Sequence, residues 1–171
     1  MKVDEDISIA EYNSNWAIWY REETEQLLNV FPNAMFEHFG STSVSGLYSK
    51  PIVDILIGLI GVLELSDEQR RKLEYLGYEV LGTAGVPGRI HCRKRGIRSF
   101  NLAVTPFDSE LWRDNLLIRD YLRSHPDEAK IYAQHKLDAY RKGYRTLIAY
   151  SDYKAEFISR LLLRAKTAQE I

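Results

Sequence analysis

A short run of glycine and hydroxyl-bearing residues is the first feature of this chain that could do chemistry. Gly40, Ser41, Thr42 and Ser43 separate two apolar runs with the composition of β-strands. Glycine lets the backbone turn tightly, so successive N–H groups can converge on an anion, with the hydroxyl groups as further donors. A helical turn beginning at Ser43 would direct its free N–H groups the same way. The same residues are equally compatible with an ordinary polar turn capped by a serine.

One carboxylate, Asp54, lies within the second apolar run, IVDILIGL. An unpaired ionised carboxylate is costly in such surroundings, so we expect Asp54 to be paired, protonated or bound to a metal. Lys50, just upstream, is a candidate partner. A Mg²⁺ site for phosphoryl or nucleotidyl transfer needs two or three carboxylates, yet the next residue on the same strand face is Leu56. Asp54 is therefore the single candidate both for catalysis and for binding Mg²⁺, the candidate cofactor.

Basic residues gather between positions 89 and 98. In a strand, Arg89, His91 and Arg93 would share one face, and arginine is well shaped for bidentate binding of phosphate. A solvated hairpin face explains the same charges. His38, just before the glycine, could donate to a ligand or simply fill the strand end. The predicted ligand-binding or phosphate-binding residues are therefore His38, Gly40, Ser41, Thr42, Ser43, Lys50, Arg89, His91 and Arg93.

Turn signals and hydrophobic periodicity place these residues in an α+β fold. We expect helices over residues 15–30, 67–76, 109–123, 126–141 and 152–166. Strands are expected before and after the glycine turn, over residues 78–81, and in a hairpin that turns near Gly96. A weak alternation over residues 7–12 predicts an edge strand. Strands thus concentrate in the first 105 residues, which favours an α+β architecture over a regularly alternating parallel sheet.

Length and composition limit the classes of protein that this chain could belong to. With 171 residues, 45% of them hydrophobic, the chain can form one core, so we expect a single domain over residues 1–171. A net charge of −1 gives no general attraction to nucleic acid or to an anionic membrane. The lone Cys92 excludes an internal disulfide. With neither a signal-peptide pattern nor a membrane-spanning run, we expect a cytoplasmic protein.

The run EHFGSTSVSGLYSKPIVDILIG resembles the signature of the GrpB family. The likeness continues through LEYLGYEV, GVPGRIHCRKRG, FNLAV, WRDNLLIRDYLRSHP, YAQHK and YKAEFI, so it covers nearly the whole chain in order. Members of this family look like nucleotidyltransferase-fold proteins, and a related domain is attached to some bacterial dephospho-CoA kinases. The resemblance implies a nucleotidyltransferase-like mixed sheet flanked by helices, with a helical C-terminal third. It also implies that Gly40 and Ser41 form the glycine–serine signature of the fold and that Asp54 is its first acid.

Two residues depart from what the resemblance implies. Leu56 stands where active nucleotidyltransferases carry their second acid, although GrpB-like proteins often lack it too. Ala103 stands where many relatives carry a histidine, which removes a plausible ligand or base. The resemblance therefore implies a fold and leaves the reaction open.

Three functions are compatible with these observations. The first is a protein that binds a nucleotide or other phosphorylated metabolite in a pocket formed by the turn, Asp54 and the basic hairpin, without catalysis. The second is a Mg²⁺-dependent nucleotidyltransferase, with Ser41 and Ser43 holding the triphosphate. The third is an interaction scaffold that uses exposed tyrosines on its C-terminal helices. None of the three calls for nucleic acid or a membrane as a partner, and all allow a homo-oligomer.

Overall fold

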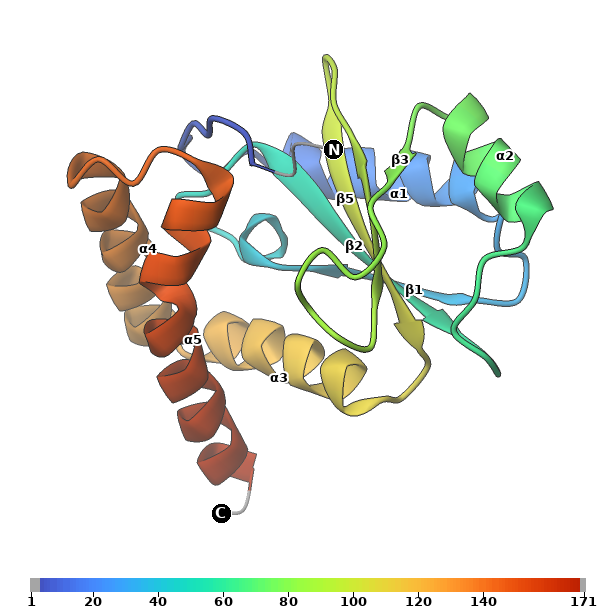
Figure 1. The fold of residues 1–171 in the computed structure, drawn as a ribbon. Helices are drawn as coiled ribbons and strands as arrows, with labels where there is room; N and C mark the ends of the chain where they lie inside the picture. The colour runs from blue at the N-terminus through green and yellow to red at the C-terminus, as the bar shows by residue number, and fades with distance from the viewer. Residues whose placement is uncertain (1–3, 170–171) are drawn as a thin grey trace.

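A five-stranded mixed sheet forms the centre of the computed structural model, which describes residues 4–169 (Figure 1). The strands lie in the order β1-β2-β5-β4-β3. Strands β2 and β5 pair in parallel, and the other three pairings are antiparallel. Their bounds are Met35–Phe39 (β1), Ile52–Leu59 (β2), Glu79–Val80 (β3), Ile90–Lys94 (β4) and Ser99–Pro106 (β5).

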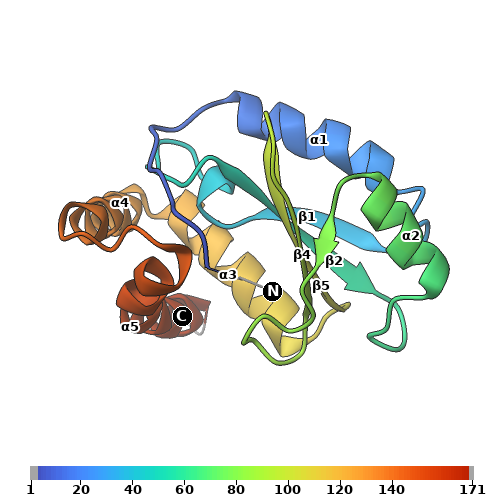
Figure 2. The same cartoon turned by 45° about the horizontal axis from the view of Figure 1, so that its top comes forward.

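Helices cover both faces of this sheet. They are α1 (Asn15–Leu27), α2 (Asp67–Tyr75), α3 (Glu110–Ser124), α4 (Pro126–Arg141) and α5 (Leu147–Gln169), with a 3₁₀ turn η1 (Ser41–Ser43) after β1. Figure 2 shows α1 and α2 on one face and α3 on the other, with α4 and α5 extending the α3 layer beyond the sheet. The expected α+β class and the helical C-terminal third are confirmed.

The alternation of side chains along β2 determines what each face of the sheet contains. Val53, Ile55 and Ile57 are fully buried in the main hydrophobic core, together with residues of α1 and α2. Leu56 points the other way and packs with Ala103 and Trp112 beneath α3. Asp54 shares this second face with Leu56, so the carboxylate lies on the side of the sheet covered by the C-terminal helices.

The segment before α1 differs from its prediction. Residues 7–12 form no edge strand; instead, isolated bridges join Asp6 to Thr146 and Ala10 to Ser49. Ile7 packs with Ala139 and Tyr150. The predicted edge strand is wrong because the partners of this segment lie at the start of α5 and before β2 rather than on a sheet edge. We call residues 4–10 the N-terminal strap.

Several predicted helix boundaries also shift. Helix α1 ends at Leu27 rather than at residue 30, and α5 begins at Leu147 rather than at residue 152. The helix over residues 126–141 is confirmed, with Pro126 in its first turn. In the described part of the chain, no helix is both long and apolar enough to cross a membrane.

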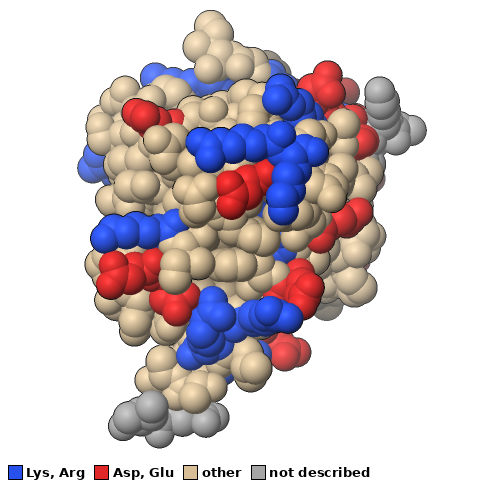
Figure 3. Space-filling model, turned by 90° about the vertical axis from the view of Figure 1, so that its left-hand side faces the viewer, with Lys and Arg blue, Asp and Glu red and all other residues tan. Residues whose placement is uncertain are grey.

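The surface on the side of α4 and α5 carries charges of both signs. Figure 3 shows lysine and arginine side chains interspersed with aspartate and glutamate over this face, without a broad region of one sign. Ion pairs form along α5 and between α4 and α5, such as Arg160 with Glu156 and Arg164 with Glu128.

Candidate functional site

The backbone of Gly40 lies directly against the carboxylate of Asp54. Gly40 follows β1, whose last residue pairs with Asp54, and it has φ 69° and ψ −171°, a conformation open essentially to glycine alone. A Cβ atom at this position would lie 2.6 Å from Oδ2 of Asp54. The glycine is thus required both by the backbone conformation and by the close approach to the carboxylate.

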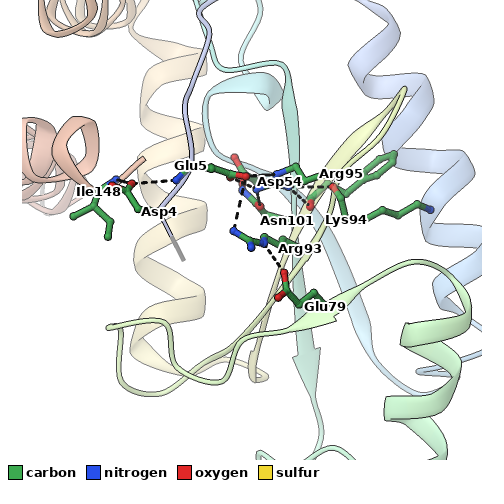
Figure 4. Close-up of polar contacts among 10 residues, drawn as sticks. Asp4, Glu5, Asp54, Glu79, Arg93, Lys94, Arg95, Asn101 and Ile148 are labelled. Atoms are coloured by element: carbon green, nitrogen blue, oxygen red, sulfur yellow. Dashed lines mark hydrogen bonds and ion pairs between the residues drawn. The ribbon is translucent and has the colours of Figure 1, made fainter. Parts of the chain in front are cut away.

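A chain of hydrogen bonds orients Asp54 from the other side (Figure 4). Nδ2 of Asn101 donates to Oδ1 of Asp54 at 2.9 Å. Arg95 donates to the amide oxygen of Asn101 at 2.9 Å and to Glu5 at 2.6 Å. Because arginine is only a donor, it must face the amide oxygen, which leaves the amide NH₂ group for Asp54. Burial raises the pKa of Asp54 above its usual value, and Lys50 and the Asn101 hydrogen bond oppose that shift.

Asp54 faces a cavity of about 200 Å³, which we call the inner hollow. It lies between the sheet and the C-terminal helices. Its polar lining includes residues of the turn, of β2 and of the segment between them, and one tyrosine and one lysine of each of α4 and α5: Gly40, Ser41, Lys50, Asp54, Tyr132, Lys136, Tyr150 and Lys154. Ser49 and two residues of α3, Asn115 and Arg119, complete this lining, and Arg119 is ion-paired with Glu37 and Asp120. The inner hollow thus gathers three lysines around one carboxylate.

Among residues 4–169, none of the three lysines has an acidic hydrogen-bond partner. Lys136 is 1% exposed, and its Nζ atom has no hydrogen-bond partner among the described residues. That atom lies 4.6 Å from the ring centroid of Tyr132. Nζ of Lys154 and Nζ of Lys50 lie 4.4 Å and 6.0 Å from the ring centroid of Tyr150. The ammonium groups contact aromatic faces, which stabilise cations more weakly than a carboxylate does.

Burial and mutual repulsion disfavour the charged forms of these lysines. Desolvation lowers the pKa of Lys154 to about 8. Desolvation, followed by the charge of Lys154, lowers the pKa of Lys50 to about 8. The same causes lower the pKa of Lys136 well below its usual value. An anion in the inner hollow would relieve this repulsion, because it would supply counter-charge beyond that of Asp54, which alone faces the three lysines.

A second, larger cavity of about 730 Å³ adjoins the inner hollow, and we call it the outer hollow. Phe39, Lys50 and Asp54 line both cavities. The remaining lining is mixed polar and apolar and includes Val86, Arg89, His91, Asn101, Leu147, Ile148 and Asp152. Asp54 therefore stands where two cavities of different character meet.

Two predicted ligand-binding residues, Arg89 and His91, do lie in the outer hollow. Burial, followed by the charge of Arg89, lowers the pKa of His91 to about 4, so its ring is neutral near pH 7. Nδ1 of His91 is buried and has no hydrogen-bond partner in the described part of the chain. Arg89 donates to the carbonyl of Thr83 at 3.3 Å, and burial lowers its pKa.

The rest of the basic hairpin is occupied by ion pairs. Nε of Arg93 donates to Glu79 at 2.7 Å, and its guanidinium also lies near Glu5. Lys94 contacts Glu23 at 2.8 Å. Arg93 is absent from the lining of both hollows, and these ion pairs hold its guanidinium beside the sheet. Its role in phosphate binding stays a prediction.

The structure places His38 on the opposite face of the sheet from Asp54. Its ring stacks on Tyr20, with the ring centroids 5.0 Å apart, and its Nε2 atom lies 3.0 Å from Oγ1 of Thr42. Burial, followed by the charge of Arg123, lowers the pKa of His38 to about 4. His38 and Thr42 thus support the turn from behind rather than facing the inner hollow.

Ser43 stabilises the turn as well. Its hydroxyl donates to the carbonyl of Gly40 at 2.6 Å, and Arg123 of α3 donates to its carbonyl at 2.8 Å. The helical turn begins at Ser41 rather than at Ser43, because the N–H of Ser43 already donates to Gly40. Within residues 4–169, no hydrogen-bond partner is found for the N–H groups of Ser41 and Thr42. Of the serines in this turn, Ser41 is the one that lines the inner hollow.

Sequence reasoning missed the residues that α4 and α5 contribute. Tyr132 and Tyr150 are 5% and 1% exposed, so these two tyrosines of the C-terminal helices face the interior. A signal was present: Tyr132 and Lys136, and likewise Tyr150 and Lys154, share a spacing of four residues on their helices. This spacing places each lysine one turn after a tyrosine on the same helix face.

The residues present do not fit a Mg²⁺ site. Asp54 is the only acidic residue that lines the inner hollow, and three lysines surround it. Leu56, at the position expected for a second carboxylate, is buried against Trp112. No group of three or more His, Cys, Asp or Glu residues suited to a metal occurs among residues 4–169. A divalent cation needs several oxygen ligands and would be repelled by the ammonium groups.

Comparison with known proteins identifies the family to which this chain belongs. The model described as "GrpB protein" matches residues 6–164. UPF0157 protein YqkA of Bacillus subtilis is 34% identical over 96% of this chain, although the chain spans only 46% of that protein's length. UPF0157 protein SCO7215 of Streptomyces coelicolor is 30% identical over 96% of this chain and 87% of its own length.

Solved structures agree with these matches. The crystal structure of the conserved protein GrpB from Enterococcus faecalis superposes with a TM-score of 0.86 at 29% identity, covering 96% of this chain and all of that one. A cytoplasmic RNA terminal U-transferase superposes with a TM-score of 0.57 at 13% identity, over 78% of this chain and 42% of that one. The second likeness concerns the fold alone. The chain belongs to the GrpB family and has a nucleotidyltransferase-like fold.

Proposed function

We propose that this protein binds a nucleotide or another small phosphorylated metabolite in the inner hollow without transforming it. The observation that carries the proposal is the set of three lysines around Asp54, none of which has an acidic hydrogen-bond partner among the described residues. Burying several ammonium groups together is costly unless a counter-ion is present. A phosphate group supplies both the charge and the acceptor oxygens.

The turn supports the same proposal. Ser41 lines the inner hollow, and within the described chain its N–H group and that of Thr42 have no hydrogen-bond partner. Backbone N–H groups in such a turn are suited to an anion. The ligand would thus contact the lysines of the helices on one side and the glycine–serine turn on the other.

Catalysis by Mg²⁺-dependent nucleotidyl transfer receives less support from the site. Such a reaction relies on metal ions held by several carboxylates, whereas Asp54 stands alone in the inner hollow and Leu56 is part of the core. The scaffold alternative loses two of its tyrosines to the interior. Binding without turnover is therefore the function that we propose.

Thermal unfolding with ATP, CTP, GTP and coenzyme A, each with and without Mg²⁺, tests the proposal. We expect at least one of these compounds to raise the Tm without needing Mg²⁺. The effect should disappear in Lys136→Met, which removes a charge that contacts no acid, and persist in Lys130→Met, which alters an exposed lysine of the same helix.

Two outcomes would contradict the proposal. If no phosphorylated compound shifts the Tm, the inner hollow is not a phosphate site. If the shift requires Mg²⁺ and is abolished by Asp54→Asn while Lys136→Met leaves it unchanged, the nucleotidyltransferase alternative is favoured.

A further inference from the structure

We propose that the ligand is a metal-free phosphomonoester of an uncharged polar molecule, with its phosphoryl group among Lys50, Lys136 and Lys154 and its body in the outer hollow beside His91. This inference rests on the proposed function and adds the chemical class of the ligand, its orientation and its independence of metal. Sugar phosphates and nucleoside monophosphates belong to this class.

The inner hollow matches a compact dianion with several acceptor atoms. Its lining contains three lysines against the single carboxyl group of Asp54. Two polar atoms of this lining, Nζ of Lys136 and Oη of Tyr150, are buried without hydrogen-bond partners among the described residues. A phosphomonoester carries roughly two negative charges near pH 7 and three strong acceptor oxygens. It can therefore satisfy both the charge and the unused donors, which a neutral ligand or a monoanion would do less completely.

The lysines occupy the position in which a metal ion would otherwise neutralise the phosphate. In metal-dependent phosphate sites, the cation bridges the phosphate oxygens and the protein carboxylates. Here the ammonium groups of Lys50 and Lys154, both beside the ring of Tyr150, already line the same cavity as Ser41 and Gly40. Free Mg²⁺ would compete with these lysines for the phosphate, so it should weaken binding or leave it unchanged.

The outer hollow has the character expected for the rest of the ligand. Its charged side chains are of both signs, with Arg89 and Lys50 against Asp54 and Asp152. His91 is neutral and offers a buried, unpartnered Nδ1 atom. Apolar side chains, among them Val86 and Ile148, complete the lining. A neutral body with hydroxyl or ring-nitrogen groups suits such a surface better than a second anionic group does.

The shared lining of the two hollows sets the orientation. Phe39, Lys50 and Asp54 border both cavities, so a ligand that spans them passes over Asp54. Oδ1 of Asp54 already accepts from Asn101. A carboxylate has further acceptor capacity, which a hydroxyl group next to the phosphoryl ester can use. Asp54 would thus accept a hydrogen bond from the part of the ligand that joins the phosphoryl group to the rest of the molecule.

Isothermal titration calorimetry with inorganic phosphate, ribose 5-phosphate, adenosine monophosphate and adenosine tests this proposal, first in EDTA and then in Mg²⁺. We expect at least one ester to bind about tenfold or more tightly than inorganic phosphate, because the body adds hydrogen bonds and apolar contact. Adenosine alone should bind weakly. Adding Mg²⁺ should not improve the affinity.

Variants separate the two cavities. Lys136→Met should weaken both inorganic phosphate and the ester. His91→Phe, which keeps the ring shape but removes the nitrogen atoms, should weaken the ester and leave inorganic phosphate unchanged. Arg89→Gln repeats the test from a second residue of the outer hollow, and circular dichroism establishes that each variant is folded. Lys130→Met, an exposed lysine of α4, is the matched control.

The result that overturns the inference differs from the one that overturns the proposed function. An ester that binds no tighter than inorganic phosphate, binding that appears only with Mg²⁺, or equal affinity in folded His91→Phe and Arg89→Gln would each refute the two-cavity, metal-free ligand. Failure of every phosphorylated compound to bind the wild-type protein would instead remove the phosphate site itself.

Discussion

Replacing Lys154 by methionine should make the ligand-free protein more stable while weakening its binding of phosphate. Methionine keeps an unbranched chain of similar length but carries no charge, so it can remain packed against Tyr150 without the desolvation of an ammonium group. Most substitutions of a partly buried residue destabilise a protein. An increase in stability coupled to a loss of binding would therefore identify the lysine as a residue kept for its ligand.

The size of the effect follows from the pKa of Lys154. A pKa of about 8 in place of 10.5 corresponds, at about 1.36 kcal/mol per pH unit, to about 3 kcal/mol against the charged form in the folded protein. The residue is partly accessible to solvent, and screening reduces this to about 1–2 kcal/mol. For a chain of this length, that is a rise in Tm of about 2–8 °C. Loss of a charge-assisted hydrogen bond to phosphate, about 1.5–3 kcal/mol, should weaken binding about 10-fold to 150-fold.

Differential scanning calorimetry at pH 7 and titration calorimetry measure the two effects on the same samples. Lys130→Met is the control. The side chain of Lys130 is 77% exposed and forms an ion pair with the exposed Asp127, so the stability of this variant should stay within about 0.5 kcal/mol of wild type. A Lys154→Met protein that is destabilised, yet binds phosphorylated compounds as tightly as wild type does, would refute the reasoning.

Three further predictions concern the same site. The stability difference between wild type and Lys154→Met should shrink as the pH rises from about 8 to 10.5. Over that range the unfolded chain binds more protons at this lysine than the folded protein does, so wild type gains stability. Denaturant titrations across this range measure the difference, and a difference that is independent of pH would contradict the prediction. Gly40→Ala should lower the free energy of unfolding by about 3 kcal/mol or more, since the backbone conformation excludes a side chain and the new Cβ would lie 2.6 Å from Oδ2 of Asp54. An unchanged midpoint of unfolding in urea would show that this turn conformation is not needed for stability. Asn101→Leu should lower the free energy of unfolding by about 1–3 kcal/mol, because it removes the hydrogen bonds to both Asp54 and Arg95. Asn101→Asp should retain the contact with Arg95. Equal stability of the leucine variant and wild type would argue against the hydrogen-bond chain.

Much of the fold follows from local patterns in the sequence. The helix over residues 126–141 has Pro126 at its start, where the missing N–H costs nothing. Helix α2 begins with a capping box in which Ser66 and Gln69 exchange hydrogen bonds. The apolar run of β2, broken only by Asp54, predicts a central buried strand with one exceptional residue. These features depend on residues close together in the sequence, which is why they were predictable.

The start of α5 shows what local patterns could not reveal. The N–H of Leu147 donates to the carbonyl of Glu5, and the N–H of Ile148 donates to Oδ1 of Asp4 (Figure 4). The helix is thus capped by a carboxylate 144 residues away in the sequence. A prediction based on capping residues just before the helix places its start at residue 152, since the true partners are brought there by the tertiary fold.

The candidate site divides in the same way. The glycine turn and Asp54 stand out because their residue types are unusual beside apolar strands. Lys136 and Lys154 do not stand out, because a lysine on an amphipathic helix is normally at the surface. Arg93 shows the opposite case. In the sequence it is one of a cluster of arginines that is compatible with a phosphate site, whereas in the fold it forms ion pairs with Glu79 and Glu5. Which charges remain unpaired depends on tertiary contacts.

The N-terminal strap also bears on the order in which the chain folds. It joins residues 4–10 to the start of α5 and to Ser49, across most of the chain. Contacts between such distant residues carry the largest loop-closure entropy, so they form late and slow the search for the native state. Since Lys154 lies on the helix that the strap caps, we expect the lysine cluster to be complete only once the strap is in place. Ligand binding should therefore appear in step with the slowest folding phase, after the sheet has formed.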